Sequence, residues 1–165
     1  MSTLYVDNLQ PNLGSRVMAA GHVVQVVEDS ISSLVTSSST FSSLKSFSIT
    51  PTSATSKIVI MYSNHLYVDS VASNAWRGAL IRLKRGSTLI YGDTDASAMY
   101  GEGAWIDYDQ DRYMTYSHHH YVDYPETTSQ VTYNLELASK DSQSNIQCNT
   151  GYGAGGRIML MEIAQ

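Results

Sequence analysis

The sequence predicts an all-β protein: a jelly-roll β-sandwich preceded by an extended N-terminal arm. The first observation is composition, since the 165 residues include 12 Tyr and 11 Gly while only 15% are charged. Strand-forming residues are plentiful, and the residues that favour exposed helix surfaces are scarce. The second observation is an alternation of apolar and polar residues with period two. The third is the regular occurrence of turn residues between short apolar runs.

The chain is long enough for one domain with its own core, which we expect to span residues 29–165. Residues 1–28 are predicted to be an attachment arm. "LYVDNLQPN" alternates and then breaks at Pro11, and the β-branched valines of "GHVVQVVED" favour a strand over a helix. A free strand edge of this kind can pair with another protein. The apolar arm residues expected to make this contact are Leu4, Val6, Val23, Val24 and Val26.

Ser and Thr dominate residues 29–56, and by composition alone this segment could be a flexible tether. Apolar residues are nevertheless spaced through it, and "FSIT" alternates with period two before Pro51 ends the strand. Ser and Thr are tolerated on the outer face of a half-buried sheet. Edge strands are therefore favoured over a linker.

Clearer strands follow from Lys57 onward. "KIVIMYSNHLYV" predicts a long strand whose Ile58 and Ile60 face away from Val59 and Met61. "GALIRLKRGSTLIYG" predicts a hairpin with a glycine in its turn. Further strands are expected in "DRYMTYSHHHYVDY", "SQVTYNLELAS", "NIQCNT" and "RIMLMEIAQ". The total of about eight to ten short strands is typical of a β-sandwich or jelly roll.

The stretch from residue 93 to residue 110 has no period and is predicted to be the longest loop, where binding function often lies. Within it, "DYDQD" faintly resembles a calcium loop but lacks the required glycine and terminal glutamate, so a solvated loop is favoured. Tyr and Trp near loops suit protein interfaces and sugar-stacking surfaces. The candidate ligand-facing residues are Tyr100, Trp105, Asp107, Tyr108 and Asp109.

Several of these segments, taken in order, resemble a family of small virion proteins of marine and cyanobacterial phages. "SFSITPTSATSKIVIMYSNHLYV" resembles that family's opening segment, in which a Ser/Thr-rich strand, an "ITPTSxxSKI" turn and a long hydrophobic strand follow one another. "ALIRLKRGSTLIYGD", "YVDYPETTSQVTYNLELAS" and "GRIMLMEIAQ" resemble the family's next hairpin, its Pro-x-Thr-Thr turn and its closing strand. "MSTLYVDNLQ" leading to "GHVVQVV" resembles its N-terminal attachment segment. The resemblance covers nearly the whole chain and is weakest between Asp93 and Asp111.

The resemblance implies a jelly roll like those of tumour necrosis factor and the complement globular heads, which usually trimerise. It also implies a place in the virion as a fibre, tail or head-decorating component of a bacteriophage, docked by the N-terminal arm. The implied partners are further copies of the chain in a homotrimer and other phage virion proteins. The motifs are structural, so the resemblance implies no catalytic residue.

A homotrimer is also indicated by the residues themselves. The runs from Ile58 to Met61 and from Ile158 to Met161 are apolar at every position, so both faces of these strands are apolar. A sheet of this kind needs a cover on its second face, and a neighbouring subunit can supply it.

Three consecutive histidines stand in "YSHHHYVDYPETT", on a predicted strand that Pro125 ends. Successive strand residues face opposite ways, so His118 and His120 share a face while His119 points to the other. A His-x-His pair offers two ligands where zinc takes three or four, although His65 or Asp123 could complete a set. Packing at a subunit interface is favoured over an ion site on a three-fold axis or a pH-sensitive contact. The interface candidates are Met114, Tyr116, His118, His120 and Val122.

The remaining features argue against several function classes. The net charge of −5 does not suit nucleic acid, whose binding requires clustered Lys and Arg. No apolar run is long enough to cross a bilayer, and the single Cys148 excludes an internal disulfide. We expect no catalytic residue, metal or cofactor, and no enzyme activity. The predicted function is a virion structural protein, and the alternative is a receptor-binding module for host surface carbohydrate, which the same fold can carry.

Overall fold

A computed structural model describes residues 20–70, 77–92, 94, 102–106, 112–140, 144–150 and 155–165, and the side chains of nearly all of these. These residues form strands joined by turns and short irregular segments. No helix among them is long and apolar enough to cross a membrane. The strands are β1 (Val23–Ile31), β2 (Leu34–Thr36), β3 (Ser42–Ile49), β4 (Lys57–Ser70), β5 (Arg77–Arg85), β6 (Thr88–Tyr91), β7 (Glu102–Ile106), β8 (Arg112–Asp123), β9 (Val131–Ser139), β10 (Ser144–Cys148) and β11 (Gly156–Ile163).

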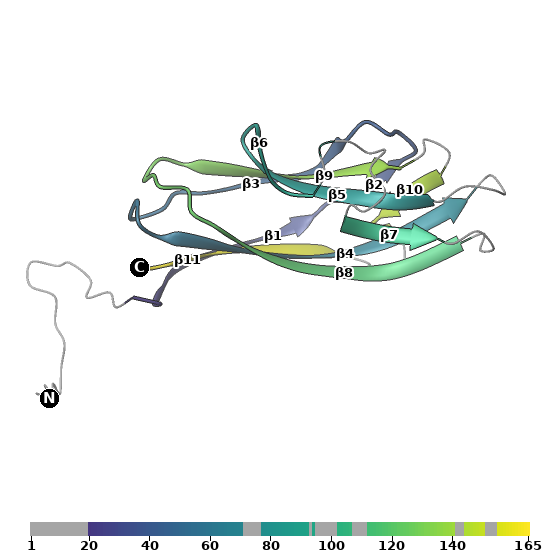
Figure 1. Ribbon diagram of the computed structural model, residues 1–165. Coiled ribbons are helices and arrows are strands. Elements are labelled where there is room, and N and C mark those ends of the chain that lie inside the picture. The colour runs from purple at the N-terminus through teal and green to yellow at the C-terminus, as the bar shows by residue number, and fades with distance from the viewer. Residues whose placement is uncertain are drawn as a thin grey trace, which may run out of the picture.

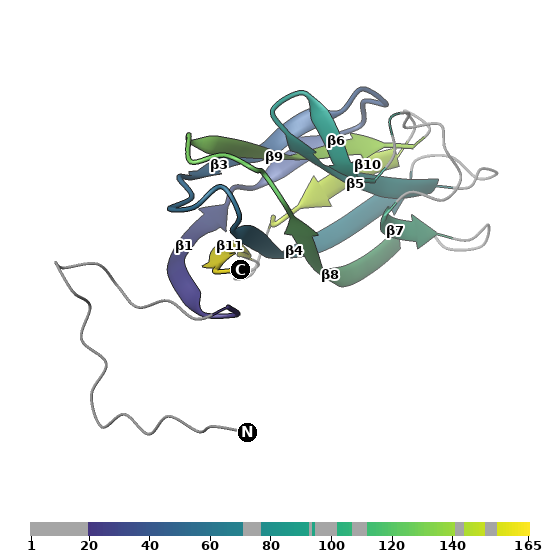
Figure 2. The same cartoon turned by 60° about the vertical axis from the view of Figure 1, so that its left-hand side comes forward.

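The strands form two sheets that pack face to face, as the layers in Figures 1 and 2 show. In the six-stranded sheet, β8 follows one edge of β4, while β11 and β10 pair in succession along the other edge. β1 lies outside β11, and β2 lies outside β10. The five-stranded sheet has the order β3-β9-β5, and β6 and β7 share the far edge of β5. The chain passes repeatedly between the sheets, so the prediction of an all-β jelly-roll sandwich is confirmed.

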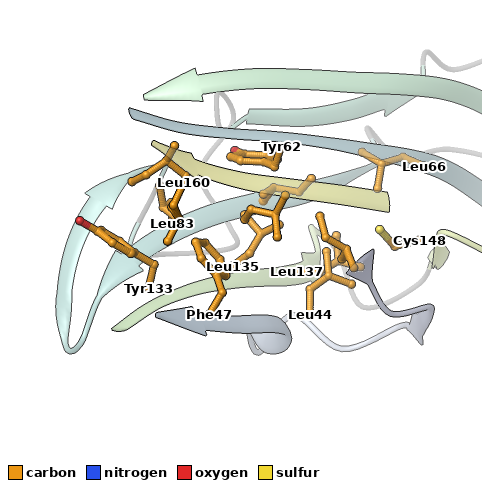
Figure 3. Close-up of a cluster of buried hydrophobic side chains, with 14 of the residues drawn as sticks. Leu44, Phe47, Tyr62, Leu66, Leu83, Tyr133, Leu135, Leu137, Cys148 and Leu160 are labelled. Atoms are coloured by element: carbon orange, nitrogen blue, oxygen red, sulfur yellow. The ribbon is translucent and has the colours of Figure 1, made fainter. Parts of the chain in front are cut away.

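The core fills the space between the sheets because each strand turns every second side chain inward (Figure 3). Val131, Tyr133, Leu135 and Leu137 of β9 are all buried, as their alternation predicts. Tyr133 stacks on Phe47 of β3, with ring centroids 5.8 Å apart. Burying each of these large side chains contributes about 1.5–3 kcal/mol. The core therefore supplies most of the stability of the sandwich.

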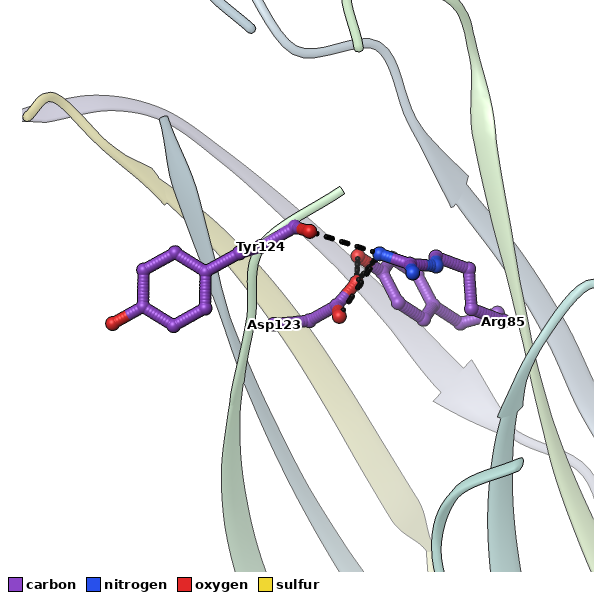
Figure 4. A network of polar contacts seen from close by, with 4 residues as sticks. Arg85, Asp123 and Tyr124 are labelled. Atoms are coloured by element: carbon purple, nitrogen blue, oxygen red, sulfur yellow. Dashed lines mark hydrogen bonds and ion pairs between the residues drawn. The ribbon is translucent and has the colours of Figure 1, made fainter. Parts of the chain in front are cut away.

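A buried carboxylate joins the two sheets at the start of the Pro-x-Thr-Thr turn (Figure 4). Arg85 donates from Nη1 to both oxygens of Asp123, over 3.0 and 2.9 Å, and to the carbonyl of Tyr124 over 3.1 Å. The hydroxyl of Tyr133 donates to Oδ2 of Asp123 over 2.7 Å. Burial, together with the neighbouring Asp123, raises the pKa of Tyr133 above its usual range. The tyrosine thus stays protonated and keeps donating to the carboxylate.

A second buried carboxylate explains the "ITPTSATSKI" turn. Glu162 of β11 accepts hydrogen bonds from the backbone N–H and the hydroxyl of Thr52, both over 2.8 Å, and from Gln25 of β1 over 2.6 Å. Burial alone would raise the pKa of Glu162, but the hydrogen bonds from Gln25, Ser56 and Thr52 outweigh burial and lower it. The motif therefore fastens β1 and the connection between β3 and β4 to the last strand.

The expected boundary between arm and domain falls inside a strand. β1 pairs with β11 from Val23 to Ile31, so Val23, Val24 and Val26 belong to the six-stranded sheet. The physical reason is that β11 needs hydrogen-bond partners on its outer edge, which the β-branched run supplies. Leu4 and Val6 lie outside the described residues.

The predicted long loop also differs from the structure. Glu102–Ile106 forms β7, which pairs with Arg77–Ile81 of β5, so Trp105 lies in a strand. This strand has only five residues, and its apolar residues are consecutive, from Ala104 to Ile106, so no alternation shows in the sequence. Tyr100, Asp107, Tyr108 and Asp109 lie outside the described residues. The Ser/Thr-rich segment forms β2 and β3, as expected from its spaced apolar residues.

Candidate functional site: the outer face of the six-stranded sheet

The outward side of β8 carries all five residues predicted to share a face. Met114 and Tyr116 are 62% and 67% exposed, and Val122 is 38% exposed. His118 and His120 are exposed on the same side. Ser117 and Asp123, whose side chains point to the opposite side of β8, are buried. Alternation along an edge strand accounts for the pattern. The histidine pair thus belongs to an apolar and aromatic stripe that faces away from the core.

This stripe continues across the sheet as a row of apolar side chains. The strand registers place Val26 of β1 beside Met161 of β11, Met161 beside Val59 of β4, and Val59 beside Val122 of β8. Val26 is 48% exposed, and Met161 and Val59 are half-buried. Antiparallel sheets that face water carry polar residues at such positions. We call these four residues the apolar row.

A depression lies beside the apolar row on the same face. Its volume is about 720 Å³, and His118 and His120 line one side while Glu28 lines the other. Met61 and Met159, which are cross-strand neighbours, form part of its floor. The depression adds shape to a face that would otherwise be a flat sheet surface.

An aromatic cluster borders the other end of β8. Tyr116 lies against His65, with ring centroids 5.0 Å apart, and stacks on His118 at 6.5 Å. Beyond it, the register places Met114 beside Tyr67. The outward side of β8 is therefore apolar or aromatic along most of its length.

The three consecutive histidines do not form a metal centre with the two residues considered for that role. Asp123 points between the sheets, where Arg85 and Tyr133 occupy its oxygens, and His119 points inward against Tyr62, with ring centroids 5.4 Å apart. His65 lies on the same face as His118, but Tyr116 lies between them. Across the part of the chain that the structure describes, no three His, Cys, Asp or Glu side chains gather closely enough to hold a metal ion.

Sequence reasoning identified the β8 stripe but not the whole face. Val26 was assigned to the arm, and its place in line with Val122 depends on two strand pairings that no local pattern encodes. The apolar character of Val59, Met61, Met159 and Met161 was the available signal. It showed that two strands are apolar on both faces, but not that their outward residues adjoin.

Comparison with known proteins gives structural likenesses only. No protein-family model matches the chain, and no curated protein sequence matches it significantly. A chain in the structure of infectious bursal disease virus, Gx strain, is 12% identical over 97% of this chain, with a TM-score of 0.38. A chain in T=1 particles derived from infectious bursal virus gives 12% identity, 98% coverage and the same TM-score. This chain spans 42% and 41% of those two viral chains.

A weaker structural likeness is to a carbohydrate-binding domain. The CBM22-1 xylan-binding domain of Xyn10C from Paenibacillus barcinonensis is 13% identical, with a TM-score of 0.28. The match covers 90% of this chain and 99% of that domain.

Proposed function

We propose that this protein is a structural component of a phage virion, in a fibre, the tail or the head decoration, and has no enzymatic role. It forms a homotrimer through the outer face of the six-stranded sheet and docks on the particle through its N-terminal segment. The observation that carries the proposal is the apolar row, which runs across four strands on an otherwise solvent-facing surface. The resemblance of the chain's motifs to those of phage virion proteins supports the virion role.

The energetics favour a protein cover for this face. Exposed apolar patches of contiguous side chains mark interaction surfaces on soluble proteins. Removing apolar surface from water is worth about 25 cal/mol per Å². A second copy of the chain is the natural partner, because most oligomers of soluble proteins are symmetric assemblies of one chain.

The docking segment is shorter than the sequence suggested. Since β1 is hydrogen bonded to β11 from Val23 onward, a deletion of residues 1–28 would break the sheet. Deletion of residues 1–20 leaves the strand intact. We expect the shortened protein to fold and trimerise but to be missing from purified particles; normal incorporation would rule out docking by this segment.

Sedimentation of the full chain tests the trimer. We expect a species of three times the 18.1 kDa subunit mass at micromolar concentration, and a folded monomer under those conditions would refute the proposal. Cysteine labelling then locates the contact. Burial raises the pKa of the Cys148 thiol to about 12, so the native cysteine reacts slowly with maleimides.

In that background, Val26→Cys should be protected in the trimer. Ser46→Cys, at an exposed position of β3 on the opposite side of the molecule, is the matched control and should react at the rate of a free thiol. Equal rates at the two positions would place the contact elsewhere.

A second candidate function is recognition of host surface carbohydrate. The observation that favours it is a small pocket of about 250 Å³ between the two sheets, whose lining is mostly tyrosine and histidine. The two roles are compatible, since a virion component can carry both a trimer interface and a receptor site.

A further inference from the structure

Two long strands of the six-stranded sheet, β1 and β8, each pair with only one of the described strands. β1 pairs with β11 and β8 pairs with β4, so the order β1-β11-β4-β8 leaves them on opposite sides of the sheet. In Figures 1 and 2, β7 lies beside the beginning of β8 only, and the rest of that strand extends past it. An edge strand presents backbone N–H and C=O groups with which a further strand can pair. The two edges are therefore candidate interaction surfaces.

The directions of these two strands allow one copy of the chain to continue the sheet of the next. Every pair in the order β1-β11-β4-β8 is antiparallel, so β8 runs antiparallel to β1. A rotation about an axis parallel to the strands leaves their direction unchanged, and it can bring β8 of one subunit beside β1 of another as an antiparallel pair. Such a pair exchanges backbone hydrogen bonds across the contact. A contact between two unlike edges closes into a ring when the rotation closes.

The apolar row indicates the register of this contact. Its two ends are Val26 on β1 and Val122 on β8, which are 48% and 38% exposed. Setting Val122 of one subunit opposite Val26 of the next continues the row across the contact without a break. Cross-strand neighbours on one face stabilise a strand pair, and this register also removes both valines from water.

The neighbouring row of side chains agrees with the same register. Moving two residues along each strand from the valine pair places His120 opposite Glu28. Within one subunit these two exposed residues stand at opposite ends of a row whose middle positions are the two methionines of the depression. An imidazole N–H can donate to a carboxylate. The register that joins the valines therefore also pairs a donor with an acceptor.

We propose that the β8 edge of each subunit pairs with the β1 edge of the next, with Val122 opposite Val26 and His120 opposite Glu28. The inference rests on the proposed trimer, in which three such contacts close a ring and the three apolar rows join end to end and face its axis. The competing occupant of the β8 edge is a strand formed by residues 1–20 of a neighbouring chain. It is disfavoured because it leaves the β1 edge, with the exposed Val26, without a partner.

Disulfide trapping on the full chain tests the contact and its register. In the double variant Val26→Cys, Val122→Cys, the two positions of one subunit lie three strand spacings apart, roughly 14 Å. A disulfide requires Cα atoms within about 7 Å of each other, so a bond between these positions can form only between subunits. We expect oxidation to give covalent dimers and trimers on a non-reducing gel, because facing residues of an antiparallel pair have Cα atoms about 4.5–5.5 Å apart. The native Cys148 is buried and should not take part.

The matched control is the double variant Ser30→Cys, Val122→Cys. Ser30 is exposed on the same face of β1 as Val26, but the proposed register places it four residues, about 13 Å, from the partner of Val122. We expect a yield of cross-linked product at least tenfold lower than with Val26→Cys.

Sedimentation of the unoxidised variants shows separately whether the trimer is intact. A trimer that does not cross-link in Val26→Cys, Val122→Cys, or that cross-links equally in the control, would overturn the edge contact and leave the trimer standing. A monomer would overturn the trimer, and the edge contact with it. Cross-linking should persist when residues 1–20 are deleted, and its loss would overturn the proposal in favour of that segment.

Discussion

The two sheets of this sandwich present outer faces of opposite character. On the five-stranded sheet, neighbouring outward side chains satisfy one another: the Ser48 and Thr132 hydroxyls are 2.9 Å apart, and Arg82 forms an ion pair with Glu136. On the six-stranded sheet, the corresponding positions carry Val and Met. Both sheets cover the same core, so core packing does not explain the difference. The difference supports the proposed contact between the six-stranded face and another subunit.

The two sheets also differ in how their outward apolar side chains are covered. Leu80 of β5 and Ala138 of β9 also point away from the main core, but Phe41 packs over them and Arg82 lies 3.9 Å above the Phe41 ring. The five-stranded sheet therefore covers its own apolar residues with intramolecular side chains. No described residue covers the apolar row in this way, and this difference supports the proposal that another subunit covers it.

The largest effect is expected from a charge placed in the apolar row. Val122→Asp should weaken self-association at least 100-fold, because an unpaired carboxylate in an apolar contact costs several kcal/mol. Sedimentation across a concentration series measures the change. Ser46→Asp adds the same charge to the five-stranded face and should leave association unchanged; an equal loss in both variants would remove the distinction between the faces.

The next largest effect is expected from loss of the Glu162 carboxylate, which accepts a hydrogen bond from Gln25 of β1, the strand that carries Val26. Glu162→Gln replaces one of the two acceptor oxygens by an amide N–H₂, so it loses the hydrogen bonds from either Thr52 or Gln25, and it should destabilise the fold by about 1–3 kcal/mol at neutral pH. The folded-state pKa of Glu162 is lowered. Its contribution is therefore complete above the unfolded value of about 4.3 and is lost as the pH falls through the folded value.

Urea unfolding measured from pH 7 down to pH 3 checks both statements. The native protein should lose stability below about pH 4.3, and Glu162→Gln should show a smaller loss over the same range. If the free energy of unfolding falls equally with pH in the two proteins, Glu162 does not account for the acid sensitivity.

A smaller effect is expected from the histidines at the edge of the depression. In the proposed trimer, His118 and His120 pack in the contact, so the double variant His118→Ala, His120→Ala should weaken association by roughly tenfold because it removes both rings from the contact. Arg157 and Glu28 face the same depression. Sedimentation across a concentration series measures the change, and unchanged association would place the two histidines outside the contact.

The smallest effect should come from the polar face. Thr132→Val removes the hydrogen bond with Ser48 at nearly constant volume, and should cost no more than about 1 kcal/mol because both groups are accessible to water. Association should not change. A large decrease in the melting temperature, or a change in sedimentation, would show that this face also takes part in the assembly.

The sequence by itself determined the fold class and the direction of most side chains. Alternation with period two placed Ile58, Ile60 and Tyr62 in the core, and put Met114, Tyr116 and His118 on one exposed face, because strand geometry dictates these directions locally. The spaced apolar residues of the Ser/Thr-rich segment predicted strands for the same reason. The sequence does not predict β7, because its five residues end in three consecutive apolar residues and show no alternation.

Only the tertiary structure decided which strands adjoin. Hydrogen-bond pairing between distant segments brought Val26 into line with Val122, drew the supposed arm into the sheet, and buried Asp123 and Glu162 among donors from other strands. The same pairing placed Leu83 of β5 and Tyr91 of β6 beside Tyr62 and Tyr121 of the other sheet, where they line one pocket. Register and sheet order depend on how the whole core packs and on where each backbone hydrogen bond finds its partner, and these are properties of the assembled chain.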